Sequence, residues 1–95
     1  MEFEITTAEV KDMLRRGIDL LLIDVREPFE HSARNIPQAV LIPMAEVPGR
    51  LDEINSGRTV VVHCTSGARS AAVCKFLRRR GVQNVFSMAG GLNAW

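Results

Sequence analysis

One stretch in the second half of the chain joins a strand to a helix through a short loop that carries a cysteine. Residues 59–62 are β-branched, three of them valines, as in a buried strand, and residues 71–80 have the pattern of a helix. Cys64 follows the strand, on the loop that leads to the helix N-terminus. The first backbone N–H groups of a helix lack intrahelical partners and the helix dipole is positive there, so an anion is stabilised. The stretch predicts strand–loop–helix units and a Cys64 thiol that ionises easily.

The residues of this loop are small or carry hydroxyl groups. Thr65, Ser66, Gly67 and Ala68 let the backbone curl so that several N–H groups point inward as a nest for an anion. The second cysteine, Cys74, lies inside the expected helix instead of at its start. Free cysteines are usually buried as small hydrophobic residues, and we expect that of Cys74.

The rest of the chain alternates strands and helices. Residues 20–25 form a continuous apolar run, typical of a parallel strand that is covered on both faces. A capping box of Thr6 and Glu9 begins a helix that Gly17 ends. Short strands are expected at 3–5, 40–42 and 85–87, a loop over 31–39 and a loose helical segment over 46–54. This alternation predicts an α/β sandwich with a largely parallel sheet.

Charged residues near the expected strand ends are further candidates. Asp24 lies at the carboxyl edge of its strand, where parallel sheets bind ligands, so it either supports the site from behind or orders the turn. Arg34 either faces an anionic substrate or is solvated. Arg26 and Glu30 are four residues apart, a spacing that allows them to pair on a short helical turn that begins near Pro28. The run 78–80 is expected to be a solvated helix end.

Composition excludes several classes of protein. Ninety-five residues make one domain, expected over 1–95, and a net charge of +1 argues against nucleic acid or a membrane as partner. The sequence has no apolar run long enough to span a bilayer. Two cysteines without framework spacing favour a reducing compartment, so we expect a cytoplasmic protein. No metal is expected, because His31, His63 and the two cysteines lack ligand spacing.

Three stretches together resemble the rhodanese-like (sulfurtransferase) family. The pattern Cys64-x-x-Gly67-x-Arg69 after an apolar strand resembles the active-site loop of that family. Residues 22–30 (LIDVREPFE) resemble its strand and DVRE segment, and residues 90–95 (GGLNAW) resemble its closing GG-x-x-AW element. The resemblance implies a three-layer sandwich with a five-stranded sheet, helices on both faces and Cys64 at the bottom of a pocket.

The chain departs from the family in one loop and at its end. Residues 34–39 correspond to the family pattern Gly-His-Ile-Pro-Gly-Ala. Ile36, Pro37 and Ala39 match it, whereas Arg34, Asn35 and Gln38 replace the two glycines and the histidine. The chain stops at Trp95, just after the GGLNAW element, whereas family domains usually continue a little further. We therefore expect a trimmed domain or a piece of a longer protein.

Sulfur transfer is the function that these features favour. The Cys64 thiolate would attack the outer sulfur of a thiosulfate-type or persulfide donor, and a thiol or cyanide would accept the sulfur from the resulting persulfide. The reaction needs no cofactor. The donor or acceptor is a small molecule or a protein. We expect the substrate to be bound by Thr65, Ser66, Gly67, Ala68, Arg69 and Ser70.

The role of Arg69 has two interpretations, and two other functions compete. Arg69 either offsets charge on the donor or leaving group, or pairs with a carboxylate and braces the loop. His63-Cys64 with Gly67 and an arginine also resembles the His-Cys-x-x-Gly-x-x-Arg loop of cysteine phosphatases. That loop is one residue longer, and Ser70 occupies the position of its arginine. The third hypothesis is a sulfur carrier or partner-binding module of a larger protein.

Overall fold

The computed structural model describes residues 3–95 and contains a five-stranded sheet in which every pair of neighbouring strands is parallel. The strand order is β1-β5-β4-β2-β3. The strands are β1 (Glu4–Ile5), β2 (Leu20–Asp24), β3 (Val40–Leu41), β4 (Thr59–His63) and β5 (Val85–Met88). The predicted α/β sandwich is confirmed, with β4 at the centre of the sheet.

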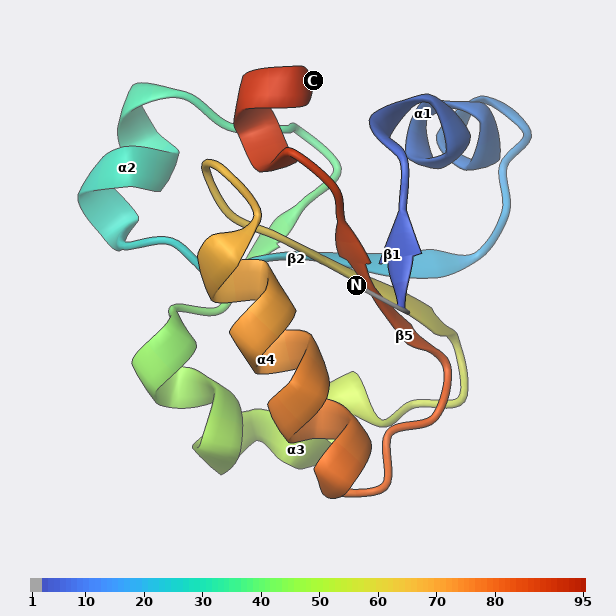
Figure 1. Cartoon of the computed structure of the whole chain (residues 1–95), viewed down its shortest axis with the longest axis vertical. Coiled ribbons are helices and arrows are strands. Elements are labelled where there is room, and N and C mark those ends of the chain that lie inside the picture. The colour runs from blue at the N-terminus through green and yellow to red at the C-terminus, as the bar shows by residue number, and fades with distance from the viewer. Residues whose placement is uncertain (1–2) are drawn as a thin grey trace.

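Within residues 3–95, four α-helices and two 3₁₀ segments cover the sheet. They are α1 (Thr7–Arg15), α2 (Pro28–Ala33), η1 (Met44–Arg50), α3 (Leu51–Ile54), α4 (Ala68–Arg79) and η2 (Gly91–Ala94). Figure 1 shows α3 and α4 on one side of the sheet, and α1 with the C-terminal turn η2 on the other. No helix in residues 3–95 is both long and apolar enough to cross a membrane.

The side chains of the central strands alternate between two separate cores. Val60, Val62 and Cys64 point to the face covered by α4, where they pack with Cys74 and neighbouring apolar residues. Val61 points to the opposite core, which also receives residues from α1 and η2. Cys74 is fully buried, as its position in the helix predicted.

The capping signals of the first helix are confirmed. The Thr6 side chain accepts a hydrogen bond from the Glu9 N–H, and the Glu9 carboxylate accepts one from the Thr6 N–H. Each of the two bonds has a donor–acceptor distance of 3.0 Å. These bonds satisfy two donors that the start of a helix otherwise leaves free. The helix therefore begins where the sequence predicted and buries Val10 against the sheet.

Three helix boundaries differ from expectation. The helical segment expected over 46–54 begins two residues earlier, at Met44, where η1 starts. Helix α4 begins at Ala68, three residues before the predicted start, because Gly67 takes a left-handed conformation with φ of 106° and caps the helix. Ala68, Arg69 and Ser70 thus lie in the first helical turn and not in the loop. Residues 31–33, expected in a loop, complete α2, which Pro28 begins.

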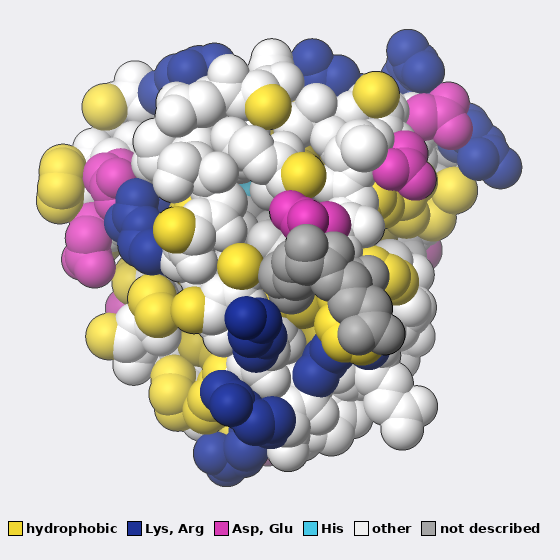
Figure 2. Space-filling view, viewed as in Figure 1, with side chains coloured by type: hydrophobic (Ala, Val, Ile, Leu, Met, Phe, Trp, Pro, Cys, Tyr) yellow, Lys and Arg dark blue, Asp and Glu magenta, His cyan; other side chains and the backbone are white. Residues whose placement is uncertain are grey.

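The basic run at the end of α4 is only partly solvated. Arg79 and Arg80 are exposed, but Arg78 stacks over the ring of Phe3 at 3.3 Å and donates to the Val85 carbonyl. The expectation of a wholly solvated run is therefore wrong at Arg78, because aromatic side chains of β5 and the N-terminal segment lie against it. Figure 2 shows Lys and Arg side chains gathered over the C-terminal half of α4.

Candidate active site

Cys64 directly follows the central strand β4, and its side chain is enclosed by the residues that follow it. Only 1% of the residue surface is exposed. The Sγ atom accepts hydrogen bonds from the backbone N–H groups of Gly67 and Ser70, whose nitrogen atoms lie 3.1 Å and 3.3 Å from it. The predicted nest of N–H groups therefore exists, and it is directed at the sulfur itself.

The two thiols have opposite electrostatic environments. Burial raises the pKa of Cys64, but hydrogen bonds from Ser70, Gly67 and Ser66 outweigh burial and lower the pKa below its ordinary value. Burial also raises the pKa of Cys74, and there it prevails. The thiolate form is thus favoured at Cys64 and disfavoured at Cys74, as expected from their places in the helix.

A pair of buried hydroxyl groups lies behind the sulfur. The Cys64 Sγ and Ser70 Oγ atoms are 3.6 Å apart, and Ser70 Oγ lies 2.8 Å from Ser87 Oγ on β5. The Ser70 hydroxyl also lies within 3.2 Å of the Gly67 carbonyl. The Ser70 hydroxyl donates its one proton to that carbonyl, so Ser87 is the donor to Ser70, and a Cys64 thiolate competes with the Gly67 carbonyl for the Ser70 proton. The sequence contained no signal for Ser87, which belongs to a different strand.

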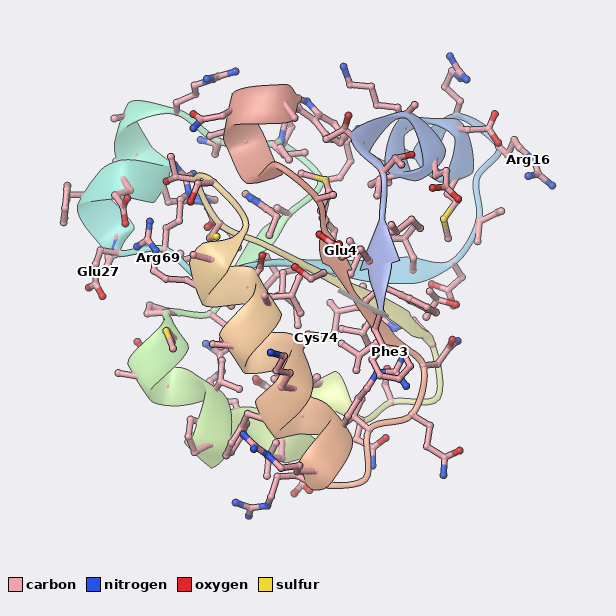
Figure 3. The ribbon with its side chains drawn as sticks, viewed as in Figure 1. Phe3, Glu4, Arg16, Glu27, Arg69 and Cys74 are labelled. Carbon is pink, nitrogen blue, oxygen red and sulfur yellow. The ribbon has the colours of Figure 1, made fainter. Side chains whose placement is uncertain are left out.

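Arg69 braces the loop by pairing with a carboxylate. Its guanidinium donates to both oxygens of Glu30, over 2.7 and 3.0 Å, and to Thr65 Oγ1 over 3.2 Å. Figure 3 shows Arg69 projecting from the start of α4 towards α2. The hydrogen bond from Arg69 is the main cause that lowers the pKa of Glu30 to about 2. Of the two roles expected for Arg69, the geometry favours the brace.

The pairing of Arg26 with Glu30 that their spacing allows does not form. Arg26 is 3% exposed and donates to both oxygens of Asp24, over 2.9 and 2.8 Å. Burial raises the pKa of Asp24, but hydrogen bonds from Arg26 and His31 prevail and lower it to about 2. Arg26 and Glu30 do not pair because each has another partner. Arg26 binds Asp24 at the end of β2, and Glu30 binds Arg69 at the start of α4.

Asp24 orders the turn after β2 and is also a hydrogen-bond partner of His31. Its Oδ1 accepts the Arg26 N–H over 3.0 Å, and its Oδ2 lies 2.9 Å from Nδ1 of His31. His63 is fully buried beside it, and desolvation lowers the pKa of its imidazole, which disfavours the charged form. Side chains alternate along the strands, so Asp24 and His63 point away from the face that holds Cys64, and a supporting role of Asp24 in the site stays a prediction.

The other predicted residues occupy varied positions. Ser66 and Ala68 are exposed beside the sulfur, and Thr65 is half-buried with its hydroxyl 3.4 Å from Glu30 Oε2. Arg34 is exposed, and its carbonyl accepts a hydrogen bond from Arg26. The side chain of Arg34 makes no ion pair within residues 3–95. Its role towards a substrate stays a prediction.

The C-terminal turn η2 closes the site from the other side. The N–H of Leu92 donates to the Cys64 carbonyl over 2.8 Å, and that of Asn93 donates to the Thr65 carbonyl over 3.0 Å. A Cβ atom on Gly91 would lie 2.5 Å from the Cys64 carbonyl oxygen. The double glycine at 90–91 therefore allows the close approach of two backbones, a reason that the sequence alone did not supply.

The connections of the sheet explain why these residues meet. The chain leaves β2 through α2 and leaves β4 through α4, and the carboxyl ends of these adjacent strands lie together, with Asp24 opposite His63. From β2 the chain continues to β3 on one side of the sheet, and from β4 it continues to β5 on the other. In open parallel sheets, a crevice forms at the carboxyl edge between two strands whose connections run in opposite directions. Glu30 and Arg69, 39 residues apart in sequence, bridge it.

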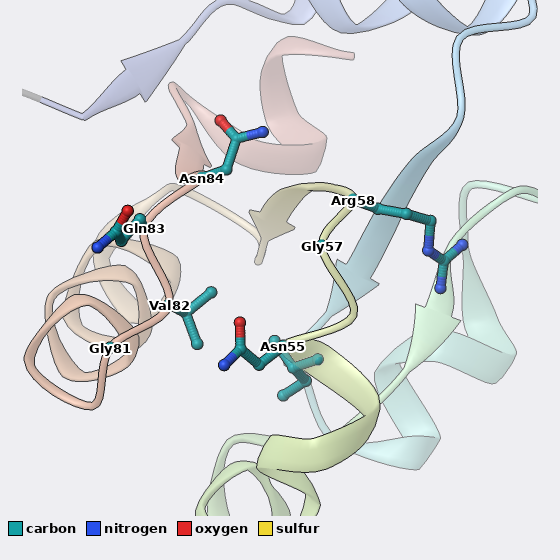
Figure 4. Close-up of a pocket in the computed structure, with 8 residues that line it drawn as sticks. Asn55, Gly57, Arg58, Gly81, Val82, Gln83 and Asn84 are labelled. Atoms are coloured by element: carbon teal, nitrogen blue, oxygen red, sulfur yellow. The ribbon is translucent and has the colours of Figure 1, made fainter.

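A hollow lies at the opposite edge of the sheet from Cys64. It has a volume of about 260 Å³ and is lined by residues that precede β4 and β5, among them Asn55, Arg58, Gln83 and Asn84 (Figure 4). The lining contains no cysteine, histidine or carboxylate. Within residues 3–95, no three His, Cys, Asp or Glu side chains gather as metal ligands do. Cys64 and its loop are therefore the candidate active site.

Comparison with known proteins identifies similar domains. A family model described as the rhodanese-like domain matches residues 6–95. A sulfurtransferase of Allochromatium vinosum is 39% identical, covering 97% of this chain and 86% of the relative. The putative sulfurtransferase YtwF of Bacillus subtilis is 40% identical, with 97% and 88% covered. The crystal structure of a rhodanese-like domain protein from Staphylococcus aureus matches with a TM-score of 0.90 and 33% identity, covering 98% and 90% of the two chains.

Proposed function

The chain belongs to the rhodanese-like domain family, and from that premise we propose that it is a sulfurtransferase whose carrier of sulfur is Cys64. One observation supports the role of Cys64 above all others. Its sulfur lies at the N-terminus of α4 and accepts two backbone N–H groups, an arrangement that stabilises an anionic sulfur. The sulfurtransferase names of the relatives support the same chemistry.

The proposed reaction has two steps. The Cys64 thiolate attacks the outer sulfur of a thiosulfate-type or persulfide donor. A bond forms between the two sulfur atoms, and the bond from the outer sulfur to the rest of the donor breaks, with its electron pair leaving on sulfite or on a thiolate. The N–H groups of Gly67 and Ser70 then stabilise the charge of the Cys64 persulfide.

The second step returns the enzyme to its first state. A thiol or cyanide attacks the outer sulfur of the persulfide, and Cys64 leaves as the thiolate that the loop already stabilises. The chemistry uses no cofactor, because the cysteine itself carries the sulfur between the two half-reactions. We place the reaction in the cytoplasm, since a reactive thiol needs reducing conditions. A protein that supplies or takes sulfur is an alternative to either small molecule.

Intact-protein mass spectrometry tests the proposal. Mixing the domain with thiosulfate or with cysteine persulfide is expected to add the mass of one sulfur atom, which a later addition of cyanide removes. Peptide mapping is expected to place the sulfur on Cys64. The Cys64→Ser variant should gain nothing, whereas Cys74→Ser, a change at the buried thiol, should load normally. Sulfur found on Cys74, or no loading from either donor, would contradict the proposal.

A further inference from the structure

Both arginines at the carboxyl ends of β2 and β4 are already neutralised by carboxylates. Arg26 is held by both oxygens of Asp24, and Arg69 is held by both oxygens of Glu30. The pair of Arg69 and Glu30 lies at the rim of the site, where the side chains keep 37% and 22% of their surface exposed. It is therefore the pair that an incoming substrate meets.

The charges around the sulfur leave no excess of positive charge. At the rim, the positive charge of Arg69 is matched by the negative charge of the Glu30 carboxylate, so these two groups and the Cys64 thiolate together carry one negative charge. Arg34 is exposed, and its carbonyl accepts a hydrogen bond from Arg26. The backbone N–H groups of Gly67 and Ser70 are directed at Sγ. A second anion thus approaches the thiolate past a guanidinium, that of Arg69, which already has a carboxylate partner.

The two possible donors differ most in charge. Thiosulfate carries two negative charges, and its attack by the thiolate transfers one sulfur atom and releases sulfite with the bonding electron pair. A protonated persulfide has no charge on its sulfur atoms. When the Cys64 thiolate attacks it, the outer sulfur is transferred with its proton and the rest of the donor leaves as a thiolate. The negative group around Cys64 repels the first donor and leaves the second unaffected.

We propose that Glu30 determines donor specificity: by neutralising Arg69, it directs the site to persulfide donors and against thiosulfate. The proposal rests on the sulfurtransferase function given above and names the donor class within it. Glu30 does not touch the sulfur. It acts through Arg69 and Thr65, whose side chains it holds at the mouth of the loop. It is therefore a positioning residue and not a catalytic one.

The decisive measurement is the ratio of kcat/KM for thiosulfate to that for cysteine persulfide, with one acceptor. Wild-type protein is expected to favour cysteine persulfide. In Glu30→Gln, Arg69 keeps its charge but loses the opposing one, and the ratio should rise by about tenfold, mainly through a lower KM for thiosulfate. High salt should reduce this gain, because it screens the freed charge.

Two further variants show whether the effect belongs to the freed guanidinium. Glu53→Gln removes a carboxylate from another Arg–Glu pair, with Arg50, on the surface of α3, and should leave the ratio unchanged. The double variant Glu30→Gln, Arg69→Gln has no cation at the rim and should return the ratio towards the wild-type value. Damage to the loop, by contrast, would lower both rates together.

The outcomes separate this inference from the function on which it rests. Failure of both donors to load Cys64 in wild-type protein would overturn the sulfurtransferase function itself. A wild-type protein that loads from both donors but favours thiosulfate would overturn the specificity alone. An unchanged ratio in Glu30→Gln, with both rates intact, would likewise show that Glu30 does not select the donor.

Discussion

At the scale of the residue, the reactivity of Cys64 depends on which hydrogen bonds favour its anion. Burial alone would suppress ionisation, as it does at Cys74. Two backbone N–H groups that donate to Sγ, and the Ser70 hydroxyl 3.6 Å from it, reverse this effect at Cys64. The difference between two buried thiols in one molecule therefore lies in their hydrogen-bond donors, not in their exposure.

This contrast predicts the pH dependence of alkylation. Because the folded pKa of Cys64 is lowered, its thiolate persists at pH values below the free-thiol midpoint of about 8.5. Alkylation by iodoacetamide, followed by peptide mapping, should give a lower midpoint for Cys64, while Cys74 stays unreactive in the folded protein. Ser70→Ala and Ser87→Ala should both raise the Cys64 midpoint. A midpoint at or above that of a free thiol would refute the activation.

The buried pair of Asp24 and Arg26 predicts sensitivity to acid. The folded pKa of Asp24 is about 2, below its ordinary value of 3.8, so its stabilising contribution is complete above about pH 4. That contribution is lost as the pH falls from about 4 to 2. Asp24→Asn leaves a buried guanidinium without its charge partner and should lower the free energy of unfolding by about 3 kcal/mol at pH 7.

Urea denaturation at several pH values measures this effect. Between pH 4 and pH 2, the variant should lose less stability than the wild type, since it lacks the titrating group. Asp12→Asn, a change in an exposed pair with Arg15 and Arg16, is the matched control and should alter stability little. Equal losses in the two variants would contradict the importance of the buried pair.

At the scale of the element, local signals in the sequence predicted the fold well. The capping box of α1, the apolar runs of β2 and β4 and the cysteine before α4 are local patterns, and each has its expected structure. The start of α4 was predicted too late, because a left-handed glycine as N-cap resembles a loop residue. Contacts between distant segments, such as Glu30 with Arg69 and Ser70 with Ser87, follow from topology and had no local signal.

The contact between η2 and the cysteine loop predicts the effect of a single methyl group. Gly91 has φ of +57°, and an added Cβ would lie 2.5 Å from the Cys64 carbonyl oxygen and 2.6 Å from that of Thr65. Gly91→Ala should therefore lower the free energy of unfolding by about 2 kcal/mol and slow alkylation of Cys64, because the loop must shift. Thermal unfolding and alkylation rates measure the two effects.

Gly49 provides the comparison for this variant. No atom lies within 4 Å of a Cβ added there, and its φ is ordinary. Gly49→Ala should leave both the unfolding temperature and the reactivity of Cys64 nearly unchanged. If Gly91→Ala behaved in the same way, the close approach of η2 to the loop would not contribute to the site.

At the scale of the whole molecule, the topology brings two helices to one crevice and so decides which chemistry the site supports. Residues of α2 and α4 meet above the ends of β2 and β4. There Glu30 of α2 forms an ion pair with the guanidinium of Arg69 in the first turn of α4. A phosphatase needs that guanidinium free, because the three peripheral oxygens of a phosphate must each meet donors as charge develops.

The arrangement therefore predicts sulfur transfer without phosphatase activity. The N–H groups of Gly67 and Ser70 lie 3.1 and 3.3 Å from Sγ, so they are directed at the cysteine sulfur. Arg69, bound by Glu30 on both sides of its fork, is not available to a tetrahedral oxyanion. The domain should move sulfur from cysteine persulfide to cyanide or a thiol, and hydrolyse an aryl phosphate negligibly.

Thiocyanate formation and release of nitrophenol, measured on one preparation, compare the two activities. Cys64→Ser should abolish sulfur transfer and leave the phosphate rate at the level of buffer. Hydrolysis of the aryl phosphate faster than transfer of sulfur, and dependent on Cys64, would show that the loop receives an oxyanion despite the ion pair. In that case the phosphatase hypothesis would replace sulfur transfer, because the same cysteine would be forming a phosphoryl intermediate in place of a persulfide.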